Sequence, residues 1–402
     1  MNLSMCHPNK TSFAGHALQS RISRGFSIVE LLVAVAVGLI GILAIMQAYD
    51  SNERIKRSTT GVGMSQANGA VALYTLERDI RMGGYGFAQK DALNCSSLAS
   101  IQWYYGGAYS STTTVGGTLA PIQTVPVLIQ DGTATSSPDT ITVTYGTDEK
   151  ALIPTSGGVS ATAGQLSVVG NYGFDTNDMV LIAQPGACML FNVTAPVAGD
   201  AASVIRVATG APGPFNPPNP AAYTPTINAA AVMNLGQLVI NKYDVVASDL
   251  RVTPMFSNIG VAGQLPVYNN VAQVIGNDIV DLKAYYGKDP AQLFATPSVT
   301  SSGALTWDKT PPTTADGWST VRVIKIALLA RSSNYEKPDP SSGLCNATDS
   351  TSLSIKFNNP TISSAAGNAT FNVIPGGLPS CYRYKAFEAI IPVRNLIWRS
   401  TT

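Results

Sequence analysis

Hydrophobic and polar residues divide the chain into an apolar run, an amphipathic stretch and a long region of short apolar segments. The apolar run, residues 26–46, contains one ionisable side chain, Glu30. As a helix, this run would span about 31 Å at roughly 1.5 Å per residue, close to the hydrocarbon thickness of a bilayer. Because a carboxylate inside a spanning helix is costly, Glu30 is predicted to have a functional partner.

The amphipathic stretch continues the helix as far as Met82. Apolar residues recur there near helical spacing and predict one core-facing side: Val62, Ala70, Leu73, Leu76 and Ile80. Three glycines within residues 59–69 each weaken a helix by up to about 1 kcal/mol relative to Ala, which predicts a bend or local melting. We expect one helix of roughly 50 residues from about Phe26 to Met82, with its first half in the membrane and its second half along a globular domain.

Beyond residue 84 the pattern changes to β. Segments rich in Val, Ile, Thr and aromatic residues predict ten or eleven strands, at residues 125–130, 140–145, 179–183, 189–194, 203–208, 238–246, 280–286, 321–330, 353–357, 370–374 and 384–392. Short loops favour antiparallel pairing, in one or two sheets laid over the helix. Residues 271–281 are expected to form a short helix. The predicted fold class is therefore α+β.

Two stretches rich in Pro and small residues, 210–226 and 290–314, interrupt the predicted strands. Proline cannot donate a ladder hydrogen bond, so the first is expected to be an extended loop. A boundary between two β lobes could fall at this loop. The expected organisation is a leader at 1–25, a membrane half-helix at 26–48, a second half-helix at 49–84 and a β-rich domain at 85–402.

The leader carries three basic residues and no acidic one, which predicts that it stays on the inner side of the membrane while the rest crosses. No small-residue cleavage site follows the apolar run, so a cut is expected before it. Cleavage after Gly25 would make Phe26 the new N-terminus. Its free amine would then lie four residues before Glu30, on the same helical face, as the natural counter-charge.

The sequence Gly25-Phe26-Ser27-Ile28-Val29-Glu30 resembles the class III signal of type IV prepilins and type II secretion pseudopilins. The resemblance implies cleavage between Gly25 and Phe26 by the prepilin peptidase, methylation of the Phe26 amine, and a role for Glu30 in docking each subunit against its neighbour. A carboxylate in the first turn also complements the positive end of the helix dipole.

The composition excludes several classes of active site and metal site. Both histidines lie in the leader, so a chain processed after Gly25 contains none. This excludes histidine triads, histidine general bases and zinc sites with histidine ligands. Charged residues make up only 12% of the chain, and no basic patch for nucleic acid is evident. The sequence predicts a protein that is not an enzyme, with no cofactor, no metal site and no nucleic-acid partner.

Four cysteines remain after the leader, and none of them forms a C-x-x-C pair: Cys95, Cys188, Cys345 and Cys381. An even number outside the cytoplasm is typical of disulfides, with buried free thiols as the alternative. Of the three pairings that four cysteines allow, we favour the more local one, Cys95 with Cys188 and Cys345 with Cys381.

Several downstream segments resemble the PilW branch of minor pilins, in order along the chain: residues 76–85, 139–145, 178–182, 190–194, 281–287, 322–332 and 393–395. This resemblance implies a type IV pilin-like fold and a low-abundance pilin that primes pilus assembly, sits in a tip complex and supports twitching motility. The implied partners are the prepilin peptidase, the major pilin, other minor pilins and the inner-membrane assembly platform. The implied location is a single-pass inner-membrane protein with a periplasmic domain, which then passes into the pilus tip.

Other functions stay open at this point. A type II secretion minor pseudopilin shares the signal, the helix and the β domain. A membrane-anchored adhesin or ligand-binding module is a second alternative, with contacts at residues 103–109 and 212–220. Residues 175–178 carry calcium-ligand residue types but lack the spacing of an EF-hand loop, so a turn is favoured.

Overall fold

The computed structural model describes residues 25–87, 90–93, 95, 101–105, 108–110, 114–115, 118–119, 124–132, 137–147, 152–154, 165–168, 170–184, 187–194, 204–206, 216, 231–257, 267–268, 271–291, 305–338, 345 and 381–397. The chain divides into two units, residues 1–56 and residues 57–402. Helix α1 (Ile28–Met82) runs through both of them, and every sheet belongs to the second.

Helix α1 is continuous over 55 residues, so the prediction of one long helix is confirmed. It does not break at the glycines of residues 59–69, where a bend or melting was expected. Its C-terminal end is capped by a residue that is distant in the sequence. The Asn395 side chain donates to the carbonyls of Met82 and Gly83, at 3.1 and 3.0 Å, and the Met82 carbonyl also accepts from the Tyr85 amide at 2.9 Å.

The face of α1 that is buried in the globular unit is lined by small residues before it becomes apolar. Its members are Gly61, Ser65, Gly69, Ala72, Leu76, Asp79 and Ile80. The predicted face is therefore partly wrong: Leu76 and Ile80 are buried, but Ala70 is exposed and Val62 is only half-buried. Hydrophobicity was a poor guide here because the helix and the sheets approach closely, which favours glycine over larger apolar residues.

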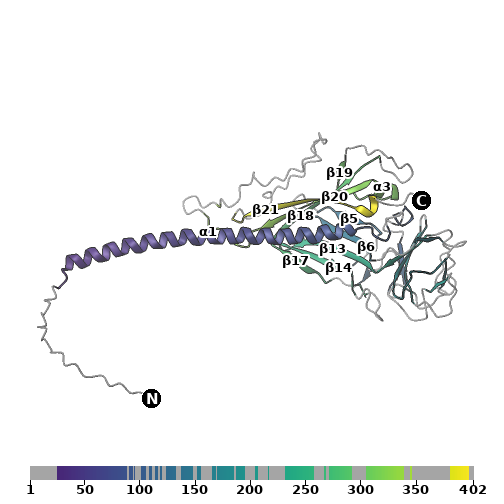
Figure 1. The fold of residues 1–402 in the computed structure, drawn as a ribbon, viewed down its shortest axis with the longest axis horizontal. Coiled ribbons are helices and arrows are strands. Elements are labelled where there is room, and N and C mark those ends of the chain that lie inside the picture. Colours follow the sequence, from purple (N-terminus) through teal and green to yellow (C-terminus); the bar gives the residue numbers. More distant parts are fainter. Residues whose placement is uncertain are drawn as a thin grey trace, which may run out of the picture. The chain divides into compact units, whose positions relative to one another are not determined.

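Two antiparallel sheets pack around this part of α1 (Figure 1). The first has the order β17-β14-β13-β6-β5 and consists of β5 (Val127–Gln130), β6 (Thr140–Gly146), β13 (Leu238–Val246), β14 (Asp249–Pro254) and β17 (Gln273–Asn277). The second has the order β19-β18-β20-β21 and consists of β18 (Ile279–Lys288), β19 (Thr306–Asp308), β20 (Val321–Arg331) and β21 (Tyr384–Pro392). Their inner faces and the helix share one core, which includes Leu76, Ile80 and Trp318.

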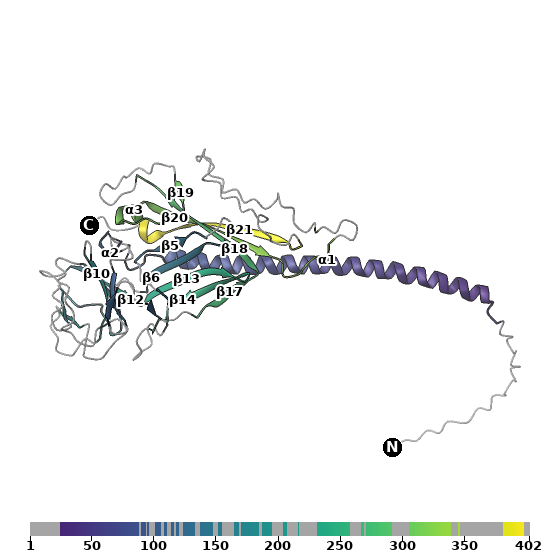
Figure 2. The ribbon, with the colours of Figure 1, turned by 180° about the vertical axis from the view of Figure 1, so that it is seen from behind.

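A third sheet lies beyond the C-terminal end of α1 (Figure 2). Its order is β2-β1-β10-β9-β12-β7, and its strands are β1 (Ile101–Tyr105), β2 (Ala108–Ser110), β7 (Leu152–Pro154), β9 (Met179–Gln184), β10 (Ala187–Asn192) and β12 (Ala231–Gly236). The pair β1 and β10 is parallel, whereas the other pairs are antiparallel. One face of this sheet packs against Phe87 and Leu238, and the other forms a core with β8 (Gln165–Ser167) and β11 (Val204–Arg206).

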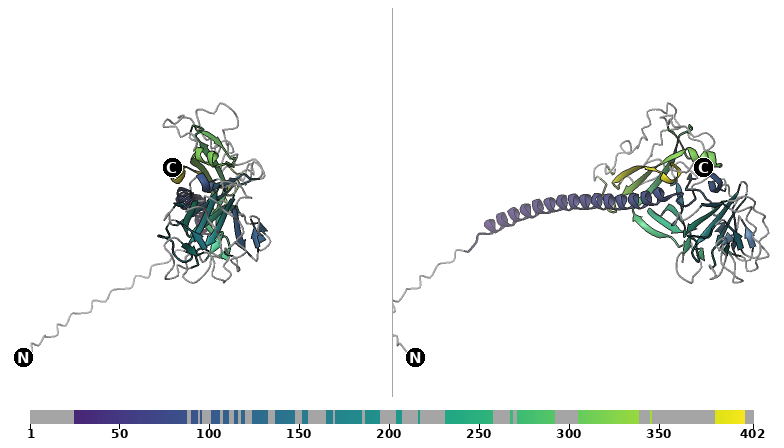
Figure 3. Two further views of the ribbon diagram at one scale, coloured as in Figure 1. Left: turned by 90° about the vertical axis from the view of Figure 1, so that its right-hand side faces the viewer. Right: turned by 45° about the vertical axis from the view of Figure 1, so that its right-hand side comes forward.

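The remaining described elements are short. They are α2 (Lys90–Leu93), α3 (Ala315–Thr320), α4 (Arg394–Ile397), and the strand pairs β3 (Thr114–Val115) with β4 (Thr118–Leu119) and β15 (Phe256–Ser257) with β16 (Val267–Tyr268). Figure 3 shows the sheets of the globular unit from two further sides. The expectation of a helix on antiparallel sheets holds, but the described residues form three larger sheets rather than one or two.

The predicted short helix at Val271–Asp281 is wrong. Residues 273–277 form strand β17, a turn follows at Asp278, and β18 begins at Ile279. Asp278 has a φ of 58°, a left-handed conformation that ends one strand and starts the next in another sheet. Gly276 lies against α1, where an added β-carbon would be 2.9 Å from the Ala72 Cβ. Helical spacing was present in the sequence, but pairing with β14 decides the conformation.

The strand before the proline-rich stretch 210–226 is β11, in the two-stranded sheet with β8, and the strand after it is β12, in the six-stranded sheet. Ile205 of β11 and Val232 of β12 belong to one core. The chain also changes sheet between β12 and β13, at Gln237. Only Asn216 of the stretch lies within the described residues, and its side chain bonds both the amide and the carbonyl of Asn192. The strands predicted at 353–357 and 370–374 lie outside the described residues.

Candidate functional site

The N-terminus of α1 is capped by the residue next to the expected cleavage site. The Val29 amide donates to Ser27 Oγ at 3.4 Å, and the Leu31 amide donates to the Ser27 carbonyl at 3.0 Å. With Ser27 as the cap, Glu30 occupies the third helical position, the spacing at which an acidic residue complements free amides. A chain beginning at Phe26 would therefore keep the whole helix and its cap.

The three residues expected to be functional are all exposed within the part of the chain that the structure describes. No atom lies within 4 Å of the position that a β-carbon on Gly25 would take. Phe26 is 80% exposed, Glu30 is exposed as well, and no described residue pairs with the Glu30 carboxylate. Folding of this chain does not require these residue types, so a reason for them has to be sought in contacts with other molecules.

The side chains of the apolar half of α1 are exposed as well. From Phe26 to Met46 the large apolar side chains are 53–80% exposed. The most apolar 18-residue window has a mean hydropathy of 2.8 and none of it is buried, so by length and composition this helix is able to cross a membrane. An apolar surface of this extent needs a bilayer or other helices to cover it.

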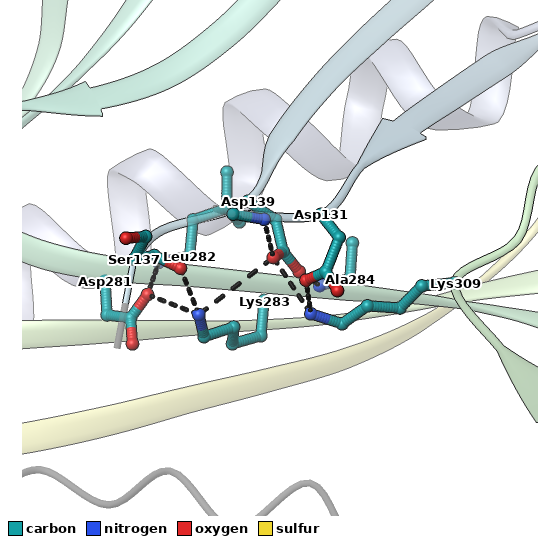
Figure 4. A network of polar contacts seen from close by, with 9 residues as sticks. Asp131, Ser137, Asp139, Asp281, Leu282, Lys283, Ala284 and Lys309 are labelled. Carbon is teal, nitrogen blue, oxygen red and sulfur yellow. Dashed lines mark hydrogen bonds and ion pairs between the residues drawn. The ribbon is translucent and has the colours of Figure 1, made fainter. Parts of the chain in front are cut away.

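Residues from two segments that were singled out in the sequence meet in the globular unit (Figure 4). Asp139, just before β6, is fully buried, and its amide donates to the Leu282 carbonyl at 2.7 Å. Its carboxylate accepts from the Ala284 amide at 2.9 Å and from Lys309 Nζ at 2.9 Å. Lys283 Nζ lies 4.0 Å from the same carboxylate and 3.6 Å from Asp281 Oδ1.

The pKa values of two aspartates in this network are raised. Burial raises the pKa of Asp281 to about 6, with Lys283 opposing the shift. Burial also raises the pKa of Asp139, against the opposing effects of Lys309 and the Ala284 amide. The network holds the β5–β6 region to β18, so its role within the fold is to join two sheets.

Comparison with known proteins bears on the N-terminus and on the C-terminal third. Residues 20–46 match the family model of the prokaryotic N-terminal methylation motif. Residues 262–395 match the family model described as type IV pilus-assembly protein W, or PilW. The chain therefore combines an N-terminal methylation motif with a PilW domain, the two features of a PilW-type pilin. The N-terminal signal implies processing by a prepilin peptidase, anchoring in a membrane and assembly with other pilins.

The PilW match spans β18, β20 and β21, the strands that bury α1 on one side. Among solved structures, a type IV-like pilin from Thermus thermophilus aligns over 82% of this chain and 96% of its own, at 10% identity and a TM-score of 0.33. No curated protein sequence matches the chain. Within the described residues, the apolar half of α1 is the longest stretch of exposed large apolar side chains.

The four cysteines that follow the leader form two disulfides, Cys95 with Cys188 and Cys345 with Cys381. These are the pairings favoured from the sequence. Their Cα atoms are 5.9 and 4.8 Å apart, within the ordinary range for disulfides. The first bond ties the segment after α2 to β10 in the six-stranded sheet.

The calcium-like segment 175–178 of this pilin is a turn. The Asp175 amide donates to Asp178 Oδ2 at 2.8 Å, and the Asn234 side chain donates to the same oxygen at 2.7 Å. Asn177 takes a left-handed φ of 74°, and β9 begins directly after Asp178. Within the described residues, no group of three or more acidic, histidine or cysteine side chains is placed to hold a metal ion.

The backbones of β1 and β2 are described, but the side chains of the aromatic segment 103–109 lie outside the description.

Sequence reasoning missed Asp79, which is the most deeply embedded charge on α1. It is 2% exposed and accepts hydrogen bonds at Oδ2 from Tyr243 Oη at 2.5 Å and Asn241 Nδ2 at 2.6 Å. Burial, followed by the Asp79 charge, raises the pKa of Tyr145 to about 12. Its position one residue before buried Ile80 was the available signal, because an acid at a core-facing position needs buried donors.

Proposed function

We propose that this minor pilin primes assembly of the type IV pilus and acts in a tip complex with other minor pilins, in support of twitching motility. Cleavage between Gly25 and Phe26 releases the amine of Phe26, which is then methylated. Glu30 docks against the terminal amine of a neighbouring subunit. The globular unit lies in the periplasm before the protein moves to the filament tip.

One observation carries the proposal: Gly25, Phe26 and Glu30 are all exposed and stand at the head of a helix whose apolar half is uncovered. In hydrocarbon, a lone carboxylate is unfavourable and a lone ammonium is equally so. Pairing between a neighbour's amine and Glu30 removes both costs and fixes the register of the two helices. The match to the methylation motif supports the same roles for these residues.

The test is the exchange Glu30→Gln in the native host, followed by co-purification of the protein with its partner pilins. We expect normal processing, about tenfold or greater loss of co-purified partners and loss of surface pili, because the neutral amide cannot pair with an ammonium. Glu53→Gln is the matched control, since it changes a carboxylate on the same helix outside the apolar run. Unchanged recovery of partners in the Glu30 variant would refute the docking role.

Processing is tested separately by replacing Gly25 with a bulky residue. We expect an unprocessed precursor held in the membrane, because a peptidase must approach an extended backbone at that position. The N-terminal residue of protein recovered from membranes gives the direct readout, which is Phe26 for the native chain. A chain that begins elsewhere contradicts the proposal.

A deletion strain separates pilus assembly from the alternative role in type II secretion. Loss of twitching and surface pili with intact exoprotein secretion is expected. The opposite phenotype would assign the chain to a secretion pseudopilus. The two disulfides suit a periplasmic globular unit in either case, because such bonds persist in oxidising compartments.

A further inference from the structure

Two carboxyl groups from separate segments converge on one ammonium at the joint between two sheets (Figure 4). Lys309 Nζ, just after β19, lies 2.9 Å from Asp139 Oδ1 and 2.5 Å from Asp131 Oδ1. Asp139 is fully buried, whereas the Asp131 side chain, just after β5, is 63% exposed. The amine therefore lies between a buried carboxyl group and a solvent-exposed one.

The buried carboxyl group is held by backbone amides on both of its oxygens. The Ala284 amide donates to Asp139 Oδ2 at 2.9 Å, and the Gly132 amide donates to Oδ1 at 3.2 Å. The ring of Tyr285 covers the amine, with Lys309 Nζ 5.1 Å from the ring centroid. Backbone donors aimed at a carboxyl oxygen are also the groups that stabilise an oxyanion when a nucleophile adds to the carbon. An ordinary ion pair does not need this arrangement.

We propose that Lys309 and Asp139 condense to an intramolecular amide, a covalent cross-link between the strand β6 region and the segment after β19. Nζ forms a bond to Cγ of Asp139, and the Cγ–Oδ1 bond breaks. The two protons that the ammonium loses end on the departing oxygen, which leaves as water. Oδ2 remains as the amide carbonyl and keeps its hydrogen bond from Ala284.

Asp131 is the residue that moves the protons. It touches the same Nζ and is open to solvent, so its carboxylate can accept a proton from the ammonium and deliver it to the leaving oxygen. Burial raises the pKa of Asp139, which favours the neutral carboxyl group that is attacked. Burial lowers the pKa of Lys309, but Asp131 and Asp139 raise it, and the net effect is a rise. The ion pair is therefore the resting form. The condensation has to occur only once in each molecule, so a slow reaction through the minor neutral form suffices.

The cross-link would close a loop between residues 170 positions apart in the sequence. It would join the five-stranded and four-stranded sheets at the point where Asp139 already bonds β18. Lys283 is the competing amine, but its Nζ is 4.0 Å from Asp139 Oδ1 and is held by Asp281 and the Ser137 carbonyl. The geometry therefore favours Lys309.

The test is the intact mass of the full mature chain purified from membranes in detergent, with both disulfides reduced. We expect a mass one water molecule below that calculated for the processed chain with its methylated N-terminus, and a proteolytic digest with one branched peptide that joins Lys309 to Asp139. Lys309→Arg is the matched variant, because it keeps the positive charge and the ion pair but cannot form the amide. Its mass should equal that calculated for the processed and methylated variant chain, with no loss of water.

Asp131→Asn tests the proton-transfer step. Freshly synthesised protein with this change should cross-link roughly 100-fold more slowly than the native chain, which is the usual scale for loss of one acid–base group. A native chain of unmodified mass, after incubation for days, would overturn the proposal. A branched peptide at Lys283 instead of Lys309 would overturn the assignment of the amine. Neither result bears on the role of Glu30, so this proposal fails or stands independently of the proposed function.

Discussion

Gly69 of α1 and Phe387 of β21 are in direct contact, with the phenyl ring occupying the volume that a β-carbon at position 69 would need. The three ring atoms nearest to that position lie well inside the van der Waals distance of a methyl group. Phe387 belongs to the edge strand of the four-stranded sheet, so this contact fixes how closely the helix approaches that sheet.

Gly69→Ala should therefore destabilise the protein, although alanine is the better helix former. We expect a loss of about 1–3 kcal/mol in the free energy of unfolding, which is the usual effect of overpacking. Gly63→Ala is the matched control, because Gly63 is on the same helix with no atom near its missing β-carbon. That variant should gain up to about 1 kcal/mol. Chemical denaturation of both proteins checks the contrast, and equal stabilities would contradict it.

Asp79→Ala should cost about 3 kcal/mol, because it leaves the Tyr243 hydroxyl and the Asn241 amide buried without their acceptor. Asp79→Asn should cost much less, since both donors share Oδ2 and an amide oxygen can receive them. Thermal unfolding of the two variants measures the difference. Equal losses would show that charge, and not hydrogen bonding, is what the site requires.

Stability should fall as pH rises from about 4 to about 6, through the titration of Asp281. Its pKa is raised from the ordinary aspartate value of 3.8 to about 6 in the folded protein, chiefly because of burial. Over this range the unfolded chain releases its proton first, so ionisation favours unfolding. At about 1.4 kcal/mol per pKa unit the full effect is on the order of 3 kcal/mol above pH 6.

Asp281→Asn provides the comparison for this pH dependence, because asparagine resembles the protonated acid. The variant should be more stable than the native chain at pH 7.5 and of equal stability near pH 4. Urea titrations at the two pH values are sufficient. A variant that is less stable at pH 7.5 would show that the Lys283–Asp281 pair outweighs the cost of burying the charge.

Replacement of both Cys95 and Cys188 by Ser should cost about 2–5 kcal/mol, the usual effect of removing a native disulfide. The bond spans 93 residues and anchors one end of β10, so limited proteolysis should attack the six-stranded sheet first. The Cys345–Cys381 pair, with a span of 36, is the control. Its removal should leave the cleavage pattern of the six-stranded sheet unchanged.

The long helix could be predicted because its signals are local: the apolar run and the helical spacing of apolar residues after it both lie within the segment that they define. The strands at 238–246 and 384–392 were likewise predicted with correct ends, since both segments are rich in Val, Ile and aromatic residues. The number of sheets could not be predicted, because strand order depends on pairings between residues far apart in sequence.

The same limit applies to the sites. Gly25, Phe26 and Glu30 form one short motif that the sequence makes visible, and their roles stay predictions. The meeting of Asp139 with Lys309 could not be read from the chain, because 170 residues separate them. The buried face at Gly61, Ser65 and Gly69 was missed for another reason, since small residues are ambiguous: they weaken an isolated helix and also permit close packing.

The six-stranded sheet takes its strands from two stretches of chain, residues 101–110 and 152–236, and between them the chain crosses into the five-stranded sheet to form β5 and β6. No single contiguous fragment contains this sheet without also carrying two strands of its neighbour. A protein engineered to display this sheet alone would have to be circularly permuted or assembled from two fragments. Deletion of residues 101–110 would remove the partner of one edge of β10, and deletion of residues 152–236 would leave β1 without β10.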